Sequence, residues 1–294
     1  MGAHLILIDA LNLIRRVYAV QERPFTQIKQ QGGKNLSPST QEQVLFNTQN
    51  TCVNALVKII NQHTPTHALA VFDSQQPCWR YQLFDGYKKG RKQMPEQLAN
   101  KLTQIQDAFM EYGVDSLTSV EDEADDLIAT LAVKMAHHGQ KVTIISTDKG
   151  FLPLINPHIH IYDYFNRRYL DEEHVKNKFN VKSSQLIDFW TLTGDNTNKI
   201  EGVSGIGQVN AAKLLNQYGS LKSLLNANDL KALLWDKLSQ SHDKMALARK
   251  LLTLKKDIPL GFNLRDIRLI TPPPVAEINH NDSRPYKVQY GRRK

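Results

Sequence analysis

Three aspartates each close a short apolar run, and together they could hold a metal ion. The runs and their acids are residues 4–8 before Asp9, residues 67–72 before Asp73, and residues 141–147 before Asp148. Each run has the β-branched and leucine content of a buried parallel strand, which is apolar on both faces. Functional groups gather beyond the carboxyl ends of the strands in an open parallel sheet, so these side chains are expected to converge.

A fourth group of acids, Glu121-Asp122-Glu123-Ala124-Asp125-Asp126, opens the helix predicted before the third strand. Any one of these acids alone would be read as a helix cap or a turn residue. Two carboxylates 4 Å apart, however, repel by about 4 kcal/mol at an effective dielectric near 20, so a larger group needs counter-charge. Oxygen ligands in this number suit Mg²⁺ or Mn²⁺ rather than zinc, which indicates metal-assisted phosphoryl-transfer chemistry.

Basic residues follow the second predicted strand in the segment Asp85-Gly86-Tyr87-Lys88-Lys89-Gly90-Arg91-Lys92, with Trp79, Tyr81 and Phe84 nearby. Aromatic side chains interleaved with Lys and Arg can stack a base while pairing with phosphates, although a solvated loop has a similar composition. Lys88 and Arg91 would both face the metal site if a helix began there. The formal net charge of +8 and the pI of about 9.3 also favour a polyanionic partner.

A glycine-rich turn, Gly202-Val203-Ser204-Gly205-Ile206-Gly207, precedes a predicted helix that begins at Val209. Gly205 and Gly207 permit a tight turn whose amides, with the helix N-terminus, point at a phosphate. Because short helices are predicted on both sides, the segment resembles a helix-hairpin-helix, which holds a duplex backbone without reading its sequence.

The elements that position these groups indicate an α/β fold with a helical second half. Helical periodicity over residues 44–62, 95–112 and 122–138 alternates with the strands and predicts a parallel sheet in a domain of residues 1–180. Short helices predicted at 184–193, 209–217, 221–225 and 243–254 form a second, DNA-binding subdomain of residues 181–270. We expect a polar loop or extended turn over 22–43 and a disordered basic tail over 271–294.

Composition excludes several classes of protein. The 294 residues are 41% hydrophobic and 22% charged, which is typical of a globular chain. No run approaches the roughly 18–20 apolar residues of a membrane span, and the first residues do not have a signal-peptide pattern. Cys52 and Cys78 are isolated, so no disulfide framework is expected. We therefore expect a cytoplasmic monomer with no membrane partner and no small-molecule cofactor.

Six motifs are similar to those of the structure-specific 5′-nuclease family, which includes the 5′-nuclease domain of bacterial DNA polymerase I and the flap endonucleases. They are LILIDA (5–10), AVFD (70–73), DGYKKGR (85–91), EDEADDLIATLA (121–132), STDKGFLPL (146–154) and TGDNTNKIEGVSGIG (193–207), within a resemblance that spans about residues 4–265. The resemblance implies a PIN-like parallel-sheet nuclease domain, an arch over about residues 79–95, and a helix-hairpin-helix subdomain.

The resemblance also implies roles for individual residues. The Mg²⁺-site acids would be Asp9, Asp73, Glu123, Asp125, Asp126 and Asp148, with Asp125 the direct ligand and the others binding directly or through water. Lys88 and Arg91 would stand at the foot of the arch, through which a single-stranded 5′ flap passes, and Tyr87 would stack near the scissile nucleotide. Backbone carbonyls of Leu192, Thr193, Glu201, Val203 and Ile206 would hold K⁺. DNA would contact Gly205, Ile206, Gly207, Gln208, Val209, Asn210 and Lys213.

This chain departs from the family pattern at four places. The family's TDxD is Thr147-Asp148-Lys149-Gly150, and its GDxxD is Gly194-Asp195-Asn196-Thr197-Asn198. Both lost acids belong to the second metal position, so a second Mg²⁺ would be held weakly or through water. Glu201 stands where a proline is usual. Val209-Asn210 replaces a Lys-Ser/Thr pair that would meet phosphate, and Lys213 one turn later is expected to compensate.

Three functions follow from these patterns. The leading hypothesis is a Mg²⁺-dependent 5′-flap endonuclease that cuts DNA near single-strand/double-strand junctions, with K⁺ aiding DNA binding. The second is a catalytically weak or inactive DNA-junction-binding protein, because Gly150 and Asn198 replace acids. The third is a PIN-like ribonuclease, which the helix-hairpin-helix disfavours because that module suits B-form duplex.

Overall fold

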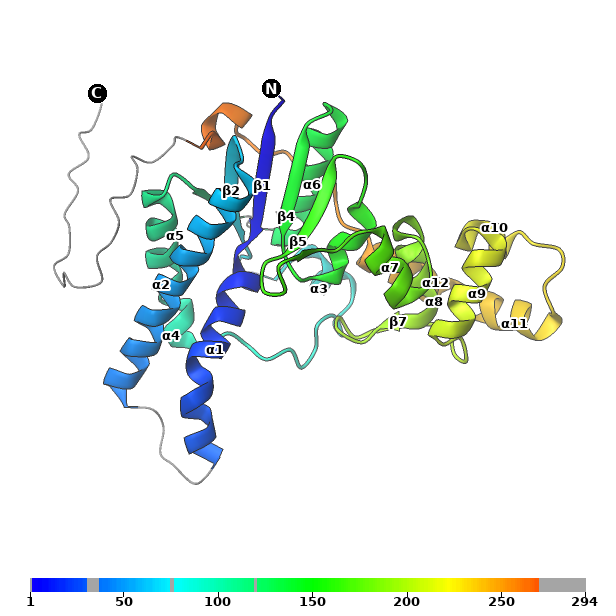
Figure 1. Cartoon of the computed structure of the whole chain (residues 1–294). Helices are drawn as coiled ribbons and strands as arrows, with labels where there is room; N and C mark the ends of the chain where they lie inside the picture. The colour runs from blue at the N-terminus through cyan, green and yellow to red at the C-terminus, as the bar shows by residue number, and fades with distance from the viewer. Residues whose placement is uncertain (1, 31–36, 75–76, 119–120, 270–294) are drawn as a thin grey trace.

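A six-stranded sheet forms the centre of the first half of the chain (Figure 1). The computed structural model describes residues 2–30, 37–74, 77–118 and 121–269, with only the backbone described over 26–30. The strands are β1 (His4–Asp9), β2 (His67–Phe72), β3 (Asp115–Thr118), β4 (Lys141–Ile145), β5 (Ile159–Asp163) and β6 (Arg168–Tyr169). Their order is β3-β2-β1-β4-β5-β6. The first five are parallel and β6 is antiparallel, which confirms the predicted α/β class.

The register of the sheet brings the predicted acids to one edge. Asp9 pairs with Val71 in β2, and Ile8 pairs with Ile145 at the end of β4. Asp73 therefore follows β2 at the level where β1 ends, and Asp148 follows β4 at the same edge. This common edge is the one that the strand-end rule predicts.

Alternating side chains of β1 build two cores, one on each face of the sheet. Ile6 and Ile8 pack with α1 (Ala10–Gln30), α2 (Pro38–His63) and α5 (Leu102–Glu111). Leu5 and Leu7 pack on the other side with α6 (Ala124–His137) and the 3₁₀ helix η1 (Lys149–Leu154). A strand whose successive side chains are all buried in this way is typical of a parallel sheet covered on both faces.

The expected loop over residues 22–43 is wrong for most of its length. Helix α1 continues to Gln30, and α2 already begins at Pro38, while residues 31–36 lie outside the described part of the chain. The segment Ser37-Pro38 is a helix start rather than a loop signal, because the Ser37 hydroxyl accepts the Thr40 N–H and proline suits the first helical position. Side by side, α1 and α2 project beyond the sheet, where polar side chains are tolerated (Figure 1).

The second half is mostly helical, as predicted, with one small hairpin. Its elements are α7 (Glu172–Phe179), η2 (Ser183–Gln185), α8 (Leu186–Thr193), β7 (Gly194–Asp195), β8 (Ile200–Glu201), α9 (Gln208–Tyr218), α10 (Leu221–Leu225), α11 (Ala232–Gln240), α12 (His242–Leu252) and η3 (Leu264–Ile267). The sequence did not predict α7 or α11. None of the helices in the described ranges is long and apolar enough to cross a membrane. The expected tail, residues 271–294, lies outside those ranges.

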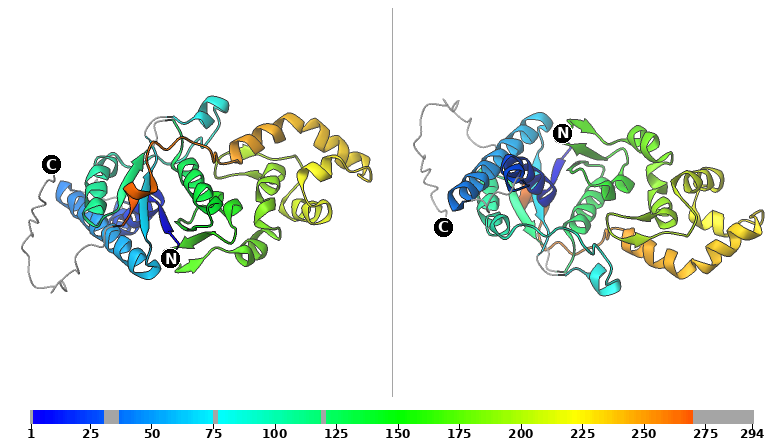
Figure 2. Two further views of the ribbon diagram at one scale, coloured as in Figure 1. Left: turned by 90° about the horizontal axis from the view of Figure 1, so that it is seen from above. Right: turned by 90° about the horizontal axis from the view of Figure 1, so that it is seen from below.

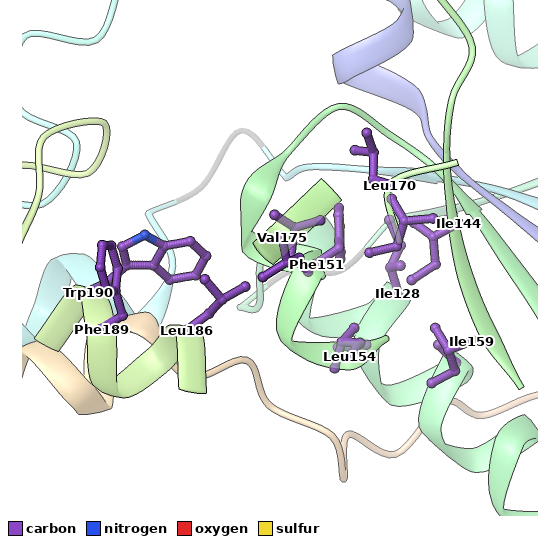
Figure 3. Packing of buried hydrophobic residues seen from close by; sticks show 14 of the residues in the cluster. Ile128, Ile144, Phe151, Leu154, Ile159, Leu170, Val175, Leu186, Phe189 and Trp190 are labelled. Carbon is purple, nitrogen blue, oxygen red and sulfur yellow. The ribbon is translucent and has the colours of Figure 1, made fainter. Parts of the chain in front are cut away.

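A shared core joins the two halves, which lie next to each other in both views of Figure 2. Figure 3 shows Phe151 of η1 and Val175 of α7 between the α8 side chains of Leu186, Phe189 and Trp190 and the sheet side chains of Ile144 and Ile159. All of them belong to the same cluster of buried residues. Because the packing is continuous, the helical half holds a fixed position relative to the acidic edge of the sheet.

Candidate active site

Four aspartates at the carboxyl edge of the sheet form the centre of the candidate site. Asp9 ends β1, Asp73 and Asp148 follow β2 and β4, and Asp125 lies in the first turn of α6. Burial, and then the charges of Asp148 and Asp73, raise the pKa of Asp9 to about 7. Burial, and then Asp148 and Asp9, raise the pKa of Asp125 well above its ordinary value. The structure thus brings all four predicted acids within electrostatic reach of one another.

Neighbouring polar groups fix these carboxylates. The Ser146 hydroxyl donates to Asp9 Oδ2 at 2.7 Å, and the Asn12 N–H donates to Asp9 Oδ1 at 3.2 Å. The Ala124 N–H donates to Asp73 Oδ1 at 2.8 Å, which ties the end of β2 to the start of α6. The sequence analysis missed Ser146 and Asn12, although each lies within three residues of a predicted acid.

The donor set suits a hard cation, although it does not form a complete cage. Across the described ranges, no three His, Cys, Asp or Glu side chains are arranged to hold one metal ion. Mg²⁺ keeps several of its waters and is bound by one or two carboxylates together with substrate phosphates, so a full protein cage is not required. No ion pair in the described part of the chain involves Asp9, Asp73, Asp125 or Asp148.

Asp126 does not join these four acids, which corrects its predicted place in the metal site. It is fully buried, and its carboxylate accepts two hydrogen bonds from Arg80, at 2.7 and 2.8 Å. Trp79 Nε1 and the Lys255 N–H donate to it as well, at 3.1 and 2.9 Å. A carboxylate whose oxygens are taken by a guanidinium and two further donors is structural, because its charge is already compensated.

Arg80 is the main residue of the site that the sequence analysis missed. Its side chain is 1% exposed, and it donates to Asp126 twice, to Glu123 Oε2 at 2.9 Å, and to the backbone carbonyls of Leu251 and Thr253. All five N–H donors of the guanidinium are therefore used. Arg80 links α3 (Trp79–Leu83), the first turn of α6 and the end of α12. The signal that could have found it is the acid surplus at 121–126, which requires a nearby cation.

Glu123 is also held by internal partners. Besides Arg80, Lys88 Nζ donates to Oε1 at 2.6 Å and the Tyr87 hydroxyl donates to Oε2 at 3.0 Å. The ring of Tyr87 is therefore buried, at 3% exposed, and is not open for the predicted stacking on a nucleotide. Tyr81, whose ring lies edge-on to Tyr87, is more accessible, at 38% exposed.

Lys88 and Arg91 both line a cavity of about 510 Å³ that also contains Asp125 and Asp148. No helix begins at this point. Residues 85–90 form turns, with Lys88 in the left-handed region at φ 52° and its N–H donating to the Asn198 carbonyl at 3.0 Å. Burial alone would lower the pKa of Lys88, but Glu123 and Asp125 reverse that effect and raise it. The lysine thus stays charged beside the acids.

An ion pair occupies the region where the chain departs from the family's acidic motifs. Lys149 Nζ lies 2.6 Å from Oδ1 of Asp195, which is only 2% exposed. Asn198 Nδ2 donates to the other oxygen of Asp195 at 2.7 Å. These residues line the same cavity as Asp125 and Asp148. The one remaining acid of the GDxxD motif is therefore neutralised by a side chain of the protein.

The predicted hairpin is formed by α8, the β7–β8 ribbon and α9. Gly202 lies so close to the 192–194 segment that a Cβ there would be 2.5 Å from the Leu192 carbonyl oxygen. The carbonyls predicted for K⁺, at 192–193 and 201–206, thus belong to adjacent segments, and those of Leu192 and Val203 also accept backbone hydrogen bonds. The residues predicted to touch DNA lie at the exposed start of α9, except Ile206, which is buried: Gly205, Gly207, Gln208, Val209, Asn210 and Lys213.

Comparison with known proteins agrees with this architecture. Residues 4–180 match the family model of the 5′-3′ exonuclease N-terminal resolvase-like domain, and residues 181–274 match that of the 5′-3′ exonuclease C-terminal SAM fold. The chain is 81% identical over 281 residues to a protein of Colwellia psychrerythraea named flap endonuclease Xni, covering 96% of this chain and 97% of the relative. A protein of the same name from Aeromonas hydrophila is 49% identical, with 93% and 97% covered.

Solved structures give the same fold. The phage T5 5′-exonuclease with bound divalent metal ions (zinc) superposes with a TM-score of 0.67 at 20% identity, covering 85% of this chain and 89% of that one. At that identity the match supports the fold alone. The two domain matches and the high identity to curated relatives establish the family. The chain belongs to the 5′-3′ exonuclease family, and within it to the flap endonucleases named Xni.

Proposed function

We propose that the chain is a structure-specific 5′-flap endonuclease that hydrolyses DNA phosphodiesters near single-strand/double-strand junctions and depends on Mg²⁺. The observation that carries this proposal is that aspartates without an ion pair and basic side chains line the same cavity region. Asp9, Asp73, Asp125 and Asp148 have no ion-pair partner within the described ranges, while Lys88 and Arg91 line the cavity beside them. The acids that form no ion pair can bind a metal ion, and the cations that line the same cavity can bind the phosphate that the metal ion contacts.

Mg²⁺ would be held by Asp125, with Asp9, Asp73 and Asp148 as further ligands or as acceptors for its waters. When bound, the ion supplies a Lewis acid and an activated water for phosphodiester hydrolysis. Asp9 is positioned for this role by Ser146 and Asn12, which hold its two oxygens. Glu123 and Asp126 support the turn that carries Asp125, because both are tied to Arg80.

The basic residues would act on the DNA rather than on the metal. Lys88 is held by Glu123 and stays protonated, so a phosphate in the cavity would meet an ammonium group whose charge Glu123 offsets only in part. Arg91 is exposed and lines two cavities that Lys88 also lines, as expected of a group that meets a strand passing the foot of an arch. Together they would neutralise the charge that develops on the scissile phosphate.

The helical half would hold the duplex part of the substrate. Amides at the start of α9 and the turn at Gly205 offer a phosphate contact, which K⁺ bound by the carbonyls at 192–193 and 201–206 would strengthen. Two free, buried cysteines, Cys52 and Cys78, suit a reducing compartment, and we propose that the enzyme works as a monomer in the cytoplasm.

A second candidate function is a junction-binding protein with weak or no nuclease activity. The Lys149–Asp195 ion pair favours it, since a protein cation already neutralises the acid that remains of the second metal position. The two candidates share their fold and their ligand, so only a cleavage measurement separates them.

The deciding experiment uses a duplex with an end-labelled 5′ flap in K⁺ buffer while Mg²⁺ is raised from zero. We expect metal-dependent products cut close to the junction, and no products in EDTA. A matching duplex without the flap serves as the control, and it should be cut much more slowly. Tight binding of the flap substrate without any cleavage across the Mg²⁺ range would establish the second candidate instead.

A further inference from the structure

A cationic hollow lies in the helical half, away from the acids. Its volume is about 420 Å³, and it is lined by the turn at Gly205 and Ile206, by Asn210, Lys213 and Leu214 of α9, and by Lys231, Leu233, Leu234 and Lys237 in and before α11. Helices α9 and α11 lie side by side at the end of the molecule farthest from the sheet (Figures 1 and 2). None of these lining residues borders the cavity that contains Asp125.

Three lysines give this hollow an unbalanced charge. Lys213, Lys231 and Lys237 all line it and no acid does. None of the three takes part in an ion pair with any residue that the structure describes. Like charges gathered around one hollow repel one another, and an anion bound among them would relieve that repulsion.

The turn at Gly205 is shaped around one of these lysines. Gly205 has φ +77°, a conformation that side chains rarely adopt, and a Cβ there would lie 2.8 Å from Lys237 Nζ. The ammonium group therefore rests against the glycine, beside the turn that leads into α9. This places a charge from α11 next to the amides at the start of α9. The first turn of α9 contains Val209 and Asn210 and has no cation of its own.

We propose that Lys231 and Lys237, with Lys213, form a cradle for neighbouring backbone phosphates of duplex DNA, which makes α11 a DNA-binding element. The inference rests on the proposed function and extends it to residues that the turn motif does not contain. Leu233 lines the same hollow and its side chain is 69% exposed, which suits contact with the apolar face of a deoxyribose. Contacts of this kind fix the position of the duplex without reading its sequence.

The test is the salt dependence of duplex affinity, measured by fluorescence anisotropy on the full chain in EDTA between about 50 and 300 mM KCl, a roughly sixfold range over which phosphate contacts change the affinity strongly. For the double variant Lys231→Gln/Lys237→Gln we expect weaker binding and a slope of log affinity against log salt smaller by about 2, one for each lost phosphate contact. The control Lys222→Gln removes an exposed lysine of α10 that does not line the hollow, and its slope should match wild type.

An unchanged slope in the double variant would overturn the proposal while leaving the nuclease assignment intact. Failure of the wild-type protein to bind duplex at any salt would count against the proposed function itself. The single variant Lys231→Gln changes an exposed side chain, so it should fold normally and still lower the slope by about 1. A slope equal to wild type in this variant would contradict the cradle as well.

Discussion

The two ends of the central sheet bring together charged groups of opposite sign: basic residues at the amino end of the parallel strands and aspartates at the carboxyl end. At the amino end, His4 and His67 begin β1 and β2, Lys141 begins β4, and His160 lies near the start of β5. Burial first, and then Lys141, lowers the pKa of His4 to about 4. At the carboxyl end, burial and neighbouring acids raise the pKa of Asp9 to about 7.

The difference explains why only one end is a candidate active site. A histidine whose pKa is lowered is neutral at pH 7, so Lys141 remains the cation among the four residues named at the amino end, and no cluster of like charges has to be balanced there. The carboxyl end gathers four aspartates that form no ion pair within the described ranges, so a proton held by Asp9 does not remove the negative charge of the group. The charge that remains there is available to bind an external cation.

Removing an aspartate from the carboxyl end of the sheet should have the largest effect. Asp125→Asn removes the proposed direct ligand of Mg²⁺, and we expect flap cleavage to fall at least about 1,000-fold, since metal ions supply several kcal/mol of transition-state stabilisation. Duplex affinity in EDTA should change little. His4→Asn, at the opposite end, is the matched control and should retain cleavage. Retained activity in Asp125→Asn would mean that the metal site has been assigned to the wrong acids.

Removing Arg80, the internal cation beside the site, should have the next largest effect, and this effect is on the free energy of unfolding. Arg80→Met would leave Asp126 buried without its partner, and we expect a loss of about 3–5 kcal/mol in the free energy of unfolding. Urea denaturation followed by circular dichroism measures it. Lys244→Met serves as the control, because Lys244 pairs with Glu201 at the surface, where the two side chains are 65% and 78% exposed.

A thermodynamic cycle sharpens that prediction. Adding Asp126→Leu to Arg80→Met removes the buried charge that the first substitution leaves without a partner. The double variant should therefore lose less free energy of unfolding than the sum of the two single losses. Strict additivity of the two losses would mean that Arg80 and Asp126 do not stabilise the α6 turn through each other.

The stability of the metal-free protein should depend on pH with opposite signs at the two ends. Between about pH 4 and 7 the folded state keeps a proton on Asp9 that the unfolded state has lost, so this group makes stability fall as pH rises, by at most about 1.4 kcal/mol per pH unit. Between about pH 4 and 6.5 the unfolded state binds a proton on His4 that the folded state does not. That group therefore makes stability rise with pH, more weakly because His4 is only half-buried.

Variants separate the two contributions. In EDTA, Asp9→Asn should make stability fall less with rising pH than in wild type, with Asp125 keeping part of that effect, and His4→Asn should make it fall more. Urea denaturation at half-unit steps of pH measures both. If both variants show the wild-type profile, the two ends do not carry the opposed charges inferred here.

The sequence predicted the strand-end acids because a parallel sheet fixes where strand ends meet. Asp9, Asp73 and Asp148 needed only this rule, and the structure brings them together with Asp125. The role of Asp126 could not be predicted in this way, because it depends on Arg80, which comes from another segment and meets α6 only through tertiary packing. The role of Tyr87 depends likewise on a tertiary contact, the hydrogen bond that its hydroxyl donates to Glu123. The loop expected over 22–43 was wrong for a related reason, since polar composition does not separate a loop from a helix that projects into solvent.

The smallest expected effect concerns the helical half, whose ion site would consist of backbone carbonyls rather than carboxylates. Replacing K⁺ by Na⁺ at constant ionic strength should weaken duplex binding several-fold, about 1 kcal/mol, because the carbonyls would fit one monovalent ion better than the other. The carbonyls of Leu192 and Val203 also accept backbone hydrogen bonds, so the hairpin itself should stay folded without K⁺. Anisotropy in EDTA measures this effect apart from the catalytic metal, and LiCl is a further control. Equal affinity in all three salts would mean that the turn binds phosphate through its amides and the nearby lysines alone.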